Sequence, residues 1–239
     1  MKNILATILG LLIAVSLLAQ QTINDPNAEV RDAKGFHGIR VSTGIQLVLT
    51  QGATEAVAIS APSAEDRGRI KTVVENGILK IHYDYDWWKL LSGKLNKKLK
   101  AYVSIVNVDQ LNAASGASLK TDGEIKADKL NVRASSGAMV IATVKTGSIN
   151  VDYSSGAIVK LSGTADDLNI DGSSGAVFNS YNLVVNTCNA GTSSGAVAKV
   201  TVNKELTGKA SSGGHISFKG EGSIRSKRTS SGGFVRRTR

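Results

Sequence analysis

A short tetrapeptide that recurs at nearly constant spacing constrains this chain more than any other feature. Ser-Ser-Gly-Ala appears seven times, with small substitutions in the first copy and in the last two. Its glycines are Gly116, Gly137, Gly156, Gly175, Gly195, Gly213 and Gly232, which lie 21, 19, 19, 20, 18 and 19 residues apart. A fixed period of this length is typical of a solenoid, in which each repeat forms one coil and packs against its neighbours.

Aligning the copies on this glycine places similar side chains in columns. The position three residues after the glycine is always apolar: Leu119, Val140, Val159, Phe178, Ala198, Ile216 and Val235. The position directly after it holds only alanine or glycine. Before the glycine, apolar residues alternate with polar ones, as at Leu130 and Val132. Alternation with a period of two predicts strands that bury one face.

These columns predict an all-β fold, a right-handed parallel β-helix or solenoid with coils of about 19 residues and an irregular N-terminal half. We expect each coil to contain two or three short strands joined by tight turns, with Ser-Ser-Gly-Ala at one corner. An outward column holds Gln110, Asn131, Asn150, Asn169 and Asn189. Stacked amides of this kind can hydrogen-bond along the solenoid axis. A β-sandwich is the alternative, but it does not require small residues at one full period.

The N-terminal half carries the pattern less clearly. Ser42-Thr43-Gly44-Ile45 imitates the corner tetrapeptide, so the solenoid is expected to start near Phe36 and to run over 36–220. Further strands are expected at 56–60, 72–74, 78–83 and 101–108. Asn76-Gly77 lies between two apolar runs and predicts a hairpin turn. Either antiparallel pairing or a widened coil would accommodate that turn.

The first residues have the pattern of a secretory signal peptide over 1–19. Lys2 precedes an uncharged stretch from Ile4 to Leu18, and small and polar residues follow it. The alternative is a membrane anchor, but this stretch is shorter than the roughly twenty residues that span a bilayer. We therefore expect an exported protein, located in the periplasm, on the outer surface or outside the cell, and not integral to the membrane after cleavage. Cys188 is the single cysteine, so no disulfide can form within the chain.

The charge of the chain indicates an anionic partner. The formal net charge is +10, and loss of Lys2 with the leader leaves +9. Acidic polysaccharide and lipopolysaccharide phosphate are candidates, whereas an exported protein is not expected to bind nucleic acid. Residues 221–239 are expected to form the last coil and a basic tail. Its arginines and lysines could protect the exposed edge, bind anions or belong to a disordered end.

One segment interrupts the pattern and supplies the candidate binding residues. Aromatic rings beside cations suit carbohydrate or anion binding through stacking and charge. The residues are Trp87, Trp88, Lys94, Lys97, Lys98 and Lys100. The alternative is that the two tryptophans cover the side of the solenoid, since large rings gain most from burial.

The sequence gives no catalytic, metal or cofactor site. His37, His82 and His215 lack the spacing of zinc ligands. Gly191-Thr192-Ser193-Ser194-Gly195 matches a hydrolase nucleophile pattern, but it lies at one of seven equivalent corners without the strand-turn-helix context. We therefore expect a non-enzymatic protein. The rival class is a polysaccharide lyase or hydrolase, which would use the aligned residues Arg133, Asp152 and Asp171.

Two motifs carry a resemblance to a known family. One is Phe36-His37-Gly38-Ile39-Arg40-Val41-Ser42-Thr43-Gly44-Ile45-Gln46-Leu47, and the other is the repeated Leu-Asn-Val/Ile-x-x-Ser-Ser-Gly-Ala. Over 36–219 the chain resembles the autotransporter adhesin head domain called GIN, a bacterial domain of unknown function, with Gln46 in place of the asparagine of that name. The resemblance implies an exported β-helical protein of Bacteroidetes-type bacteria with an adhesin role and no catalytic residues. The expected function is adhesin-like binding or structural support in the cell envelope.

Overall fold

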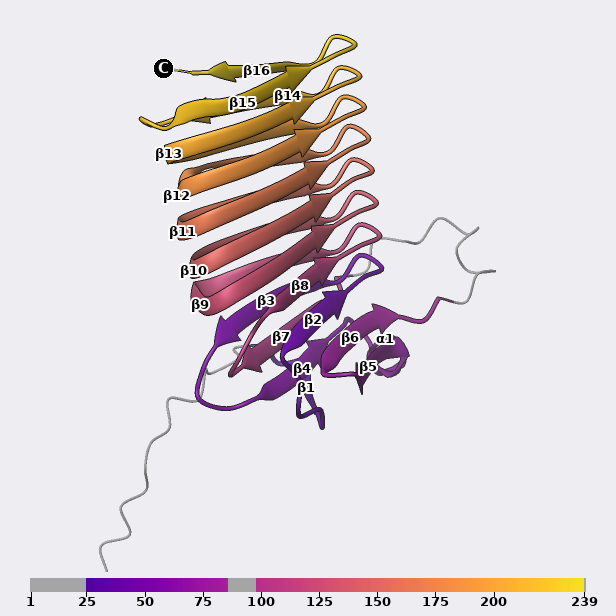
Figure 1. The fold of residues 1–239 in the computed structure, drawn as a ribbon. Helices are drawn as coiled ribbons and strands as arrows, with labels where there is room; N and C mark the ends of the chain where they lie inside the picture. The colour runs from indigo at the N-terminus through magenta and orange to yellow at the C-terminus, as the bar shows by residue number, and fades with distance from the viewer. Residues whose placement is uncertain (1–24, 86–97, 239) are drawn as a thin grey trace, which may run out of the picture.

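The fold is a parallel β-solenoid whose N-terminal end is closed by antiparallel strands (Figure 1). The computed structural model describes residues 25–85 and 98–238. Five long strands wind through the solenoid: β9 (Ser118–Ala134), β10 (Met139–Tyr153), β11 (Ile158–Gly172), β12 (Val177–Thr192) and β13 (Val197–Ala210). Each pairs in parallel with the next. The predicted solenoid with its 19-residue period is confirmed, since Val140 of β10 aligns with Val159 of β11.

The predicted core columns lie inside the coils. Val140 stacks between Leu119 and Val159, and all three side chains are fully buried. In the other half of the coil, Ile149 stacks between Leu130 and Leu168 in the same way. Because strand side chains alternate between two faces, each buried column fixes the residues beside it as outward-facing. The columns therefore set the surface as well as the core.

Each Ser-Ser-Gly-Ala copy forms a tight corner with left-handed backbone angles. Ser155 and Gly156 have φ angles of 51° and 71°, as in a type I′ turn. The N–H of Gly156 donates to the carbonyl of Ser174 in the next coil at 3.1 Å, and the other corners repeat this bond. Thr43-Gly44 has the same angles and donates to Ser115, which confirms the predicted first corner. The corners lie in single file along one edge (Figure 1).

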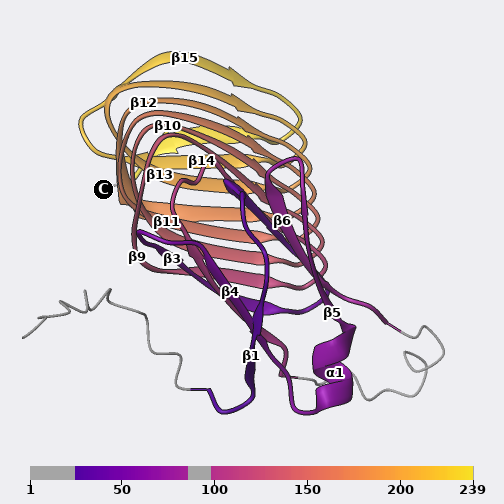
Figure 2. The ribbon, with the colours of Figure 1, turned by 90° about the horizontal axis from the view of Figure 1, so that it is seen from below.

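The prediction of two or three short strands in each coil is wrong. A coil is one curved strand of 14 to 17 residues with a single tight corner. Away from the corner, irregularities in the register let the strand bend while its pairing continues, for example between Ile141 and Thr143. Gly163 takes part with a φ of 105° at a place where a Cβ would lie 2.0 Å from the Val144 carbonyl oxygen. Viewed along the axis, the coils are elongated, rounded loops (Figure 2).

The irregular N-terminal half continues both sides of the solenoid. Its elements are β1 (Ala28–Arg31), β2 (Gly38–Val41), β3 (Gln46–Gln51), β4 (Ala56–Ser60), α1 (Ala64–Arg69), β5 (Ile70–Glu75), β6 (Ile78–Tyr83), β7 (Lys100–Ile105) and β8 (Gln110–Ala113). On one side β3 lies between β7 and β9, and on the other β2 and β8 lie between β6 and β9. Beyond them, β4 and β1 extend the first side and β5 the second, all antiparallel.

The hairpin predicted at Asn76-Gly77 is confirmed. It joins β5 to β6, and both residues have left-handed angles. The next connection, from Tyr83 to Lys100, links β6 to β7. β6 pairs with β2 and β7 pairs with β3, so this connection joins the two sides of the solenoid. In the next coil the corresponding connection, between β2 and β3, is the corner at Thr43-Gly44. The hairpin thus leads to antiparallel pairing, one of the two alternatives expected from the sequence.

The C-terminal end consists of shorter strands: β14 (His215–Lys219), β15 (Ser223–Thr229) and β16 (Phe234–Arg237). β15 pairs with β13, and β16 pairs with β14. Arg237 donates to the carbonyls of Gly220 and Gly222, and Arg225 pairs with Glu205 at 3.2 Å. Arg225 and Arg237 are therefore held against the last coils by side-chain contacts, and a role of the basic end in anion binding stays a prediction.

Candidate functional site

The predicted aromatic and lysine cluster lies mostly outside the described residues. Trp87, Trp88, Lys94 and Lys97 belong to 86–97, so their predicted role is untested. Lys98 is exposed. Lys100 lies at the start of β7, and its Nζ is 3.7 Å from Asp25 Oδ2.

A hydrogen-bonded pair lies beside Lys100 and makes this lysine less suitable for binding a ligand. The Tyr102 hydroxyl donates to Asp25 Oδ2 at 2.9 Å. Burial, with a smaller effect of this bond, raises the pKa of Tyr102 to about 12. The same bond, followed by that from the Asn27 N–H, lowers the pKa of Asp25. The carboxylate next to Lys100 is therefore charged at neutral pH and offsets the lysine.

The outward side of the coil halves before the corners forms an amide face. Its first column is the one predicted from the sequence: Gln110, Asn131, Asn150, Asn169 and Asn189. Asn150 donates to Asn131 Oδ1 at 2.9 Å, and Asn169 donates to Asn150 Oδ1 at 3.1 Å. The predicted amide hydrogen bonds are thus confirmed for three coils. This ladder ties the coils together along the axis.

The second column of the amide face contains the residues of the rival enzyme hypothesis. Arg133, Asp152 and Asp171 are aligned on adjacent coils, and Arg133 Nε lies 3.0 Å from Asp152 Oδ2. Both side chains of this ion pair are more than half exposed. Tyr153 lies next to these residues, and its hydroxyl donates to the Val197 carbonyl in the core. Burial, and to a smaller extent the negative charge of Asp171, raises the pKa of Tyr153. The phenol of Tyr153 is therefore held protonated and turned inward, away from the stripe.

A small cavity of about 320 Å³ opens beside this stripe. Arg40 and Arg133 border it, and Asn112 lies between them in the strand register. Asn112 is buried, and its Oδ1 has no hydrogen-bond partner among the residues that the structure describes. The cavity is partly open to solvent, and its lining combines charged residues with apolar ones such as Ala113 and Ala134, so it does not enclose a ligand as a typical small-molecule pocket does.

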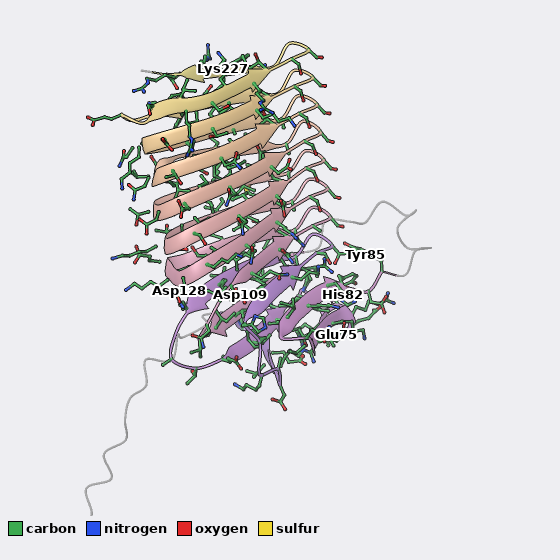
Figure 3. All side chains as sticks on the ribbon, in the orientation of Figure 1. Glu75, His82, Tyr85, Asp109, Asp128 and Lys227 are labelled. Carbon is green, nitrogen blue, oxygen red and sulfur yellow. The ribbon has the colours of Figure 1, made fainter. Side chains whose placement is uncertain are left out.

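A larger groove of about 1000 Å³ follows the edge opposite the corners. Lys126, Lys129 and Lys145 line it together with Asp109, Asp128 and Asp166. Asp109 and Asp128 lie near each other on this side of the molecule (Figure 3). Asp109 pairs with His37 Nδ1 at 2.9 Å, and Asp166 accepts from Asn186 at 2.9 Å. Because its charges are balanced, the groove does not select strongly for anions or cations.

Sequence reasoning missed a third surface, which we call the lysine face. It is the outward side of the coil halves after the corners and consists of two columns. The first column holds Ser118, Met139, Ile158, Val177, Val197, His215 and Phe234. The second holds Lys120, Ile141, Lys160, Asn179, Lys199, Ser217 and Arg236. Neither column contains a carboxylate, so the face is cationic along its length.

Most side chains of the lysine face reach solvent, whereas Ser217 is buried. Lys120 and Lys160 are exposed and Lys199 is half-buried. Within the described part of the chain, none of these three lysines takes part in an ion pair. The first column adds partly exposed apolar side chains beside them. The sequence contained this signal at two and four residues after each corner glycine, but the residue types vary from coil to coil.

Two further properties describe the molecule outside these surfaces. Within the described ranges, no group of three or more histidine, cysteine, aspartate or glutamate side chains is placed to hold a metal ion. The helix found there, α1, is too short and too polar to cross a bilayer, and no other helix in that part of the chain meets the requirement.

Solved structures share this fold at low sequence identity. A "putative adhesin" from Bacteroides fragilis is 17% identical with a TM-score of 0.75, and the match covers 88% of this chain and 94% of that one. A "putative adhesin" from Parabacteroides merdae is 14% identical with a TM-score of 0.69, covering 89% and 95%. A "putative lipid binding protein" from Parabacteroides distasonis is 14% identical with a TM-score of 0.65, covering 90% and 98%. A search of curated proteins gave no match.

A family match extends over most of the chain. The family described as "Putative auto-transporter adhesin, head GIN domain" matches residues 35–222. These residues run from just before β2 to just before β15, and so include all the long strands and every corner of the file except the last one, at Gly232. The resemblance noted in the sequence is therefore confirmed, and the chain belongs to the auto-transporter adhesin head GIN domain family.

Proposed function

We propose that this protein is an exported, non-enzymatic, adhesin-like module of the bacterial envelope that binds anionic polysaccharide. The adhesin family and the adhesin-like fold support the binding role. The observation that carries the choice of ligand is the lysine face, where Lys120, Lys160 and Lys199 lie on one side of the solenoid without a neighbouring carboxylate in their columns. Unpaired cations on a fixed surface attract polyanions.

Export is proposed from the leader-like residues 1–19, which lie outside the described residues. The periplasm, the outer surface and the extracellular space all satisfy this proposal. The solved relatives from Bacteroides and Parabacteroides support an origin in Bacteroidetes-type bacteria. A net charge of +10 for the full chain favours an acidic partner in any of these places.

Binding without catalysis is supported by the stripe of Arg133, Asp152 and Asp171. Arg133 and Asp152 neutralise each other at 3.0 Å in an exposed position. A lyase or hydrolase must instead hold its acid and base in a cleft that excludes water and fixes the sugar. The stripe borders the small, partly open cavity of the amide face, where its three side chains remain exposed to solvent, so it suits solvation better than catalysis.

A glycan array with the mature protein, run beside reducing-sugar and unsaturated-product assays, tests this function. We expect binding to acidic glycans, weaker binding to neutral ones and no released product. Product release that survives replacement of Trp87 and Trp88 by alanine but is lost in Asp152→Ala would establish the rival enzyme function.

A further inference from the structure

We infer that the lysine face binds a linear acidic polysaccharide that runs along the solenoid axis and carries one negative charge per disaccharide. This binding mode rests on the proposed function and adds the face, the direction of the polymer and the spacing of its charges. The evidence for this binding mode is the strand register, the partly exposed apolar column and the rigidity of the coils.

The strand register places a cation on every second coil. Lys120 and Lys160 both align with Ile141, which lies on the coil between them. Asn179, which follows the aligned pair Val159 and Phe178, occupies the next coil and pairs with Lys199. Since neighbouring strands lie about 4.8 Å apart, successive lysines are separated by about 10 Å along the axis. This separation is comparable with one disaccharide of an extended glycan and longer than a single sugar.

The apolar column beside the lysines gives the polymer a second contact. Met139, Ile158, Val177 and Val197 stack on four successive coils, and each remains partly exposed. A continuous, partly exposed apolar strip leaves apolar surface in contact with water, and such a strip can serve as a binding surface. The C–H faces of pyranose rings can cover such a strip while the sugar carboxylates reach the lysines. A polymer lying across the axis would meet only one or two members of either column.

The columns are held in place before any ligand arrives. Each strand is bonded to the coils above and below it, and fully buried residues such as Val140 and Val159 fix its inner side. A rigid row of equivalent contacts gains affinity by multivalency, because each added contact forms within the same complex. Affinity should therefore rise with oligosaccharide length until the ligand spans the three lysines and Arg236, the cation two coils beyond Lys199 in the same column, and then level off.

Calorimetric titration with hyaluronan oligosaccharides tests this binding mode, because hyaluronan carries one carboxylate per disaccharide. We expect affinity to increase from the tetrasaccharide through the hexasaccharide to the octasaccharide and little beyond it, with no binding of uncharged dextran. The variant combining Lys120→Gln, Lys160→Gln and Lys199→Gln should lose about tenfold in affinity for the hexasaccharide, since each exposed ion pair contributes only a few-fold. Raising the salt concentration should weaken the wild type more than this variant.

A matched variant separates the lysine face from overall charge. Lys126→Gln, Lys129→Gln and Lys145→Gln remove the same charge from the groove on the opposite edge. Its affinity should stay within about twofold of the wild type, because exposed charges more than a Debye length away are screened. Equal losses in both triple variants would overturn the assignment to the lysine face. A second test is Ile158→Thr with Val177→Thr, which should weaken binding several-fold but leave its salt dependence unchanged.

The remaining outcomes show whether only this binding mode is wrong or the proposed polysaccharide-binding function is wrong as well. If the wild type binds none of hyaluronan, polygalacturonate and chondroitin sulfate, the proposed polysaccharide function fails together with this mode. If it binds polygalacturonate, which has a charge on every sugar, at least as tightly as hyaluronan, only the charge spacing is wrong. Binding to phosphatidylglycerol vesicles without binding to any of these glycans would reassign the face to a lipid surface.

Discussion

The corner residues illustrate how a single backbone angle is maintained through the solenoid. Left-handed angles cost a non-glycine residue about 1 kcal/mol or more, yet a serine or threonine adopts them at every corner. The glycine that follows has open space around its Cα, as at Gly156 and Gly175, so its backbone freedom is what the turn uses. The bond from each corner glycine except the last to the serine carbonyl of the next corner supports this geometry from coil to coil.

A different glycine is required for space. A Cβ at Gly172 would lie 2.2 Å from Cζ of the buried Tyr153 ring on the preceding coil. Gly172→Ala should therefore lower the free energy of unfolding by about 1–3 kcal/mol, as overpacking of a core does. Urea titration followed by circular dichroism measures this loss.

Gly191 provides the control, because a Cβ there would meet only the Ile170 carbonyl oxygen at an ordinary 3.7 Å. Gly191→Ala should be neutral or slightly stabilising, since alanine costs less backbone entropy than glycine. Adding Tyr153→Leu to Gly172→Ala should make the two losses less than additive. Full additivity would show that the ring does not limit the site.

Cys188 is a residue whose chemistry is suppressed by its position. It lies in the core column between Leu168 and Leu206, and burial raises the pKa of its thiol to about 12. At pH 8 the thiolate, which is the reactive form, is therefore scarcer than in an exposed cysteine. The native protein should not react with a disulfide reagent, whereas urea should release one thiol per chain. Rapid labelling of the native protein, at the rate of Ser155→Cys in a Cys188→Ala background, would contradict this burial.

At the scale of elements, the coils are joined by amides as well as by backbone bonds. Asn150 is central in this ladder, because it donates to Asn131 and accepts from Asn169. Asn150→Ala should lower the free energy of unfolding by about 1–2 kcal/mol, since two hydrogen bonds are lost. Denaturant titration gives the value.

Asn189 lies in the same column, and within the described residues its side chain makes no hydrogen bond in the ladder. Asn189→Ala should therefore change the stability by less than about 0.5 kcal/mol. Equal losses at both positions would mean that the ladder contributes nothing beyond the presence of an asparagine.

The sequence predicted correctly which face of each strand is buried, but the strands that it predicted were too short. Alternation showed that Val132 and Val140 point inward, and both are buried. It could not show that the strand runs on from Val140 to the next corner, because a bulge and a turn both interrupt an alternation with a period of two. Only the register around Ile141 and Gly163 reveals a bend without a break.

At the scale of the whole molecule, the features that repeat with the same residue types could be predicted from the sequence, and the others could not. The corner file, the core columns and the amide ladder recur with the same residue types, so alignment on one glycine was sufficient. The N-terminal strands do not follow chain order, since β3 lies between β7 and β9, and no local pattern encodes that arrangement. The lysine face was missed because Lys120, Ile141 and Lys160 differ in type and are related only by register.

The distance between corners tests the stacking of the coils most directly. Spin labels on cysteines at the exposed corner serines, in a Cys188→Ala background, allow distances to be measured by double electron–electron resonance. Suitable pairs join Ser231 to Ser155, Ser136 and Ser115, which are four, five and six corners away in the file.

The account predicts separations of about 19, 24 and 29 Å, because each coil adds about 4.8 Å. The three values should fall on one straight line, displaced at most by the length of the label arms. Distances that do not increase with the number of intervening corners would show that the corners are dispersed, and the solenoid with its ligand-binding columns would be wrong.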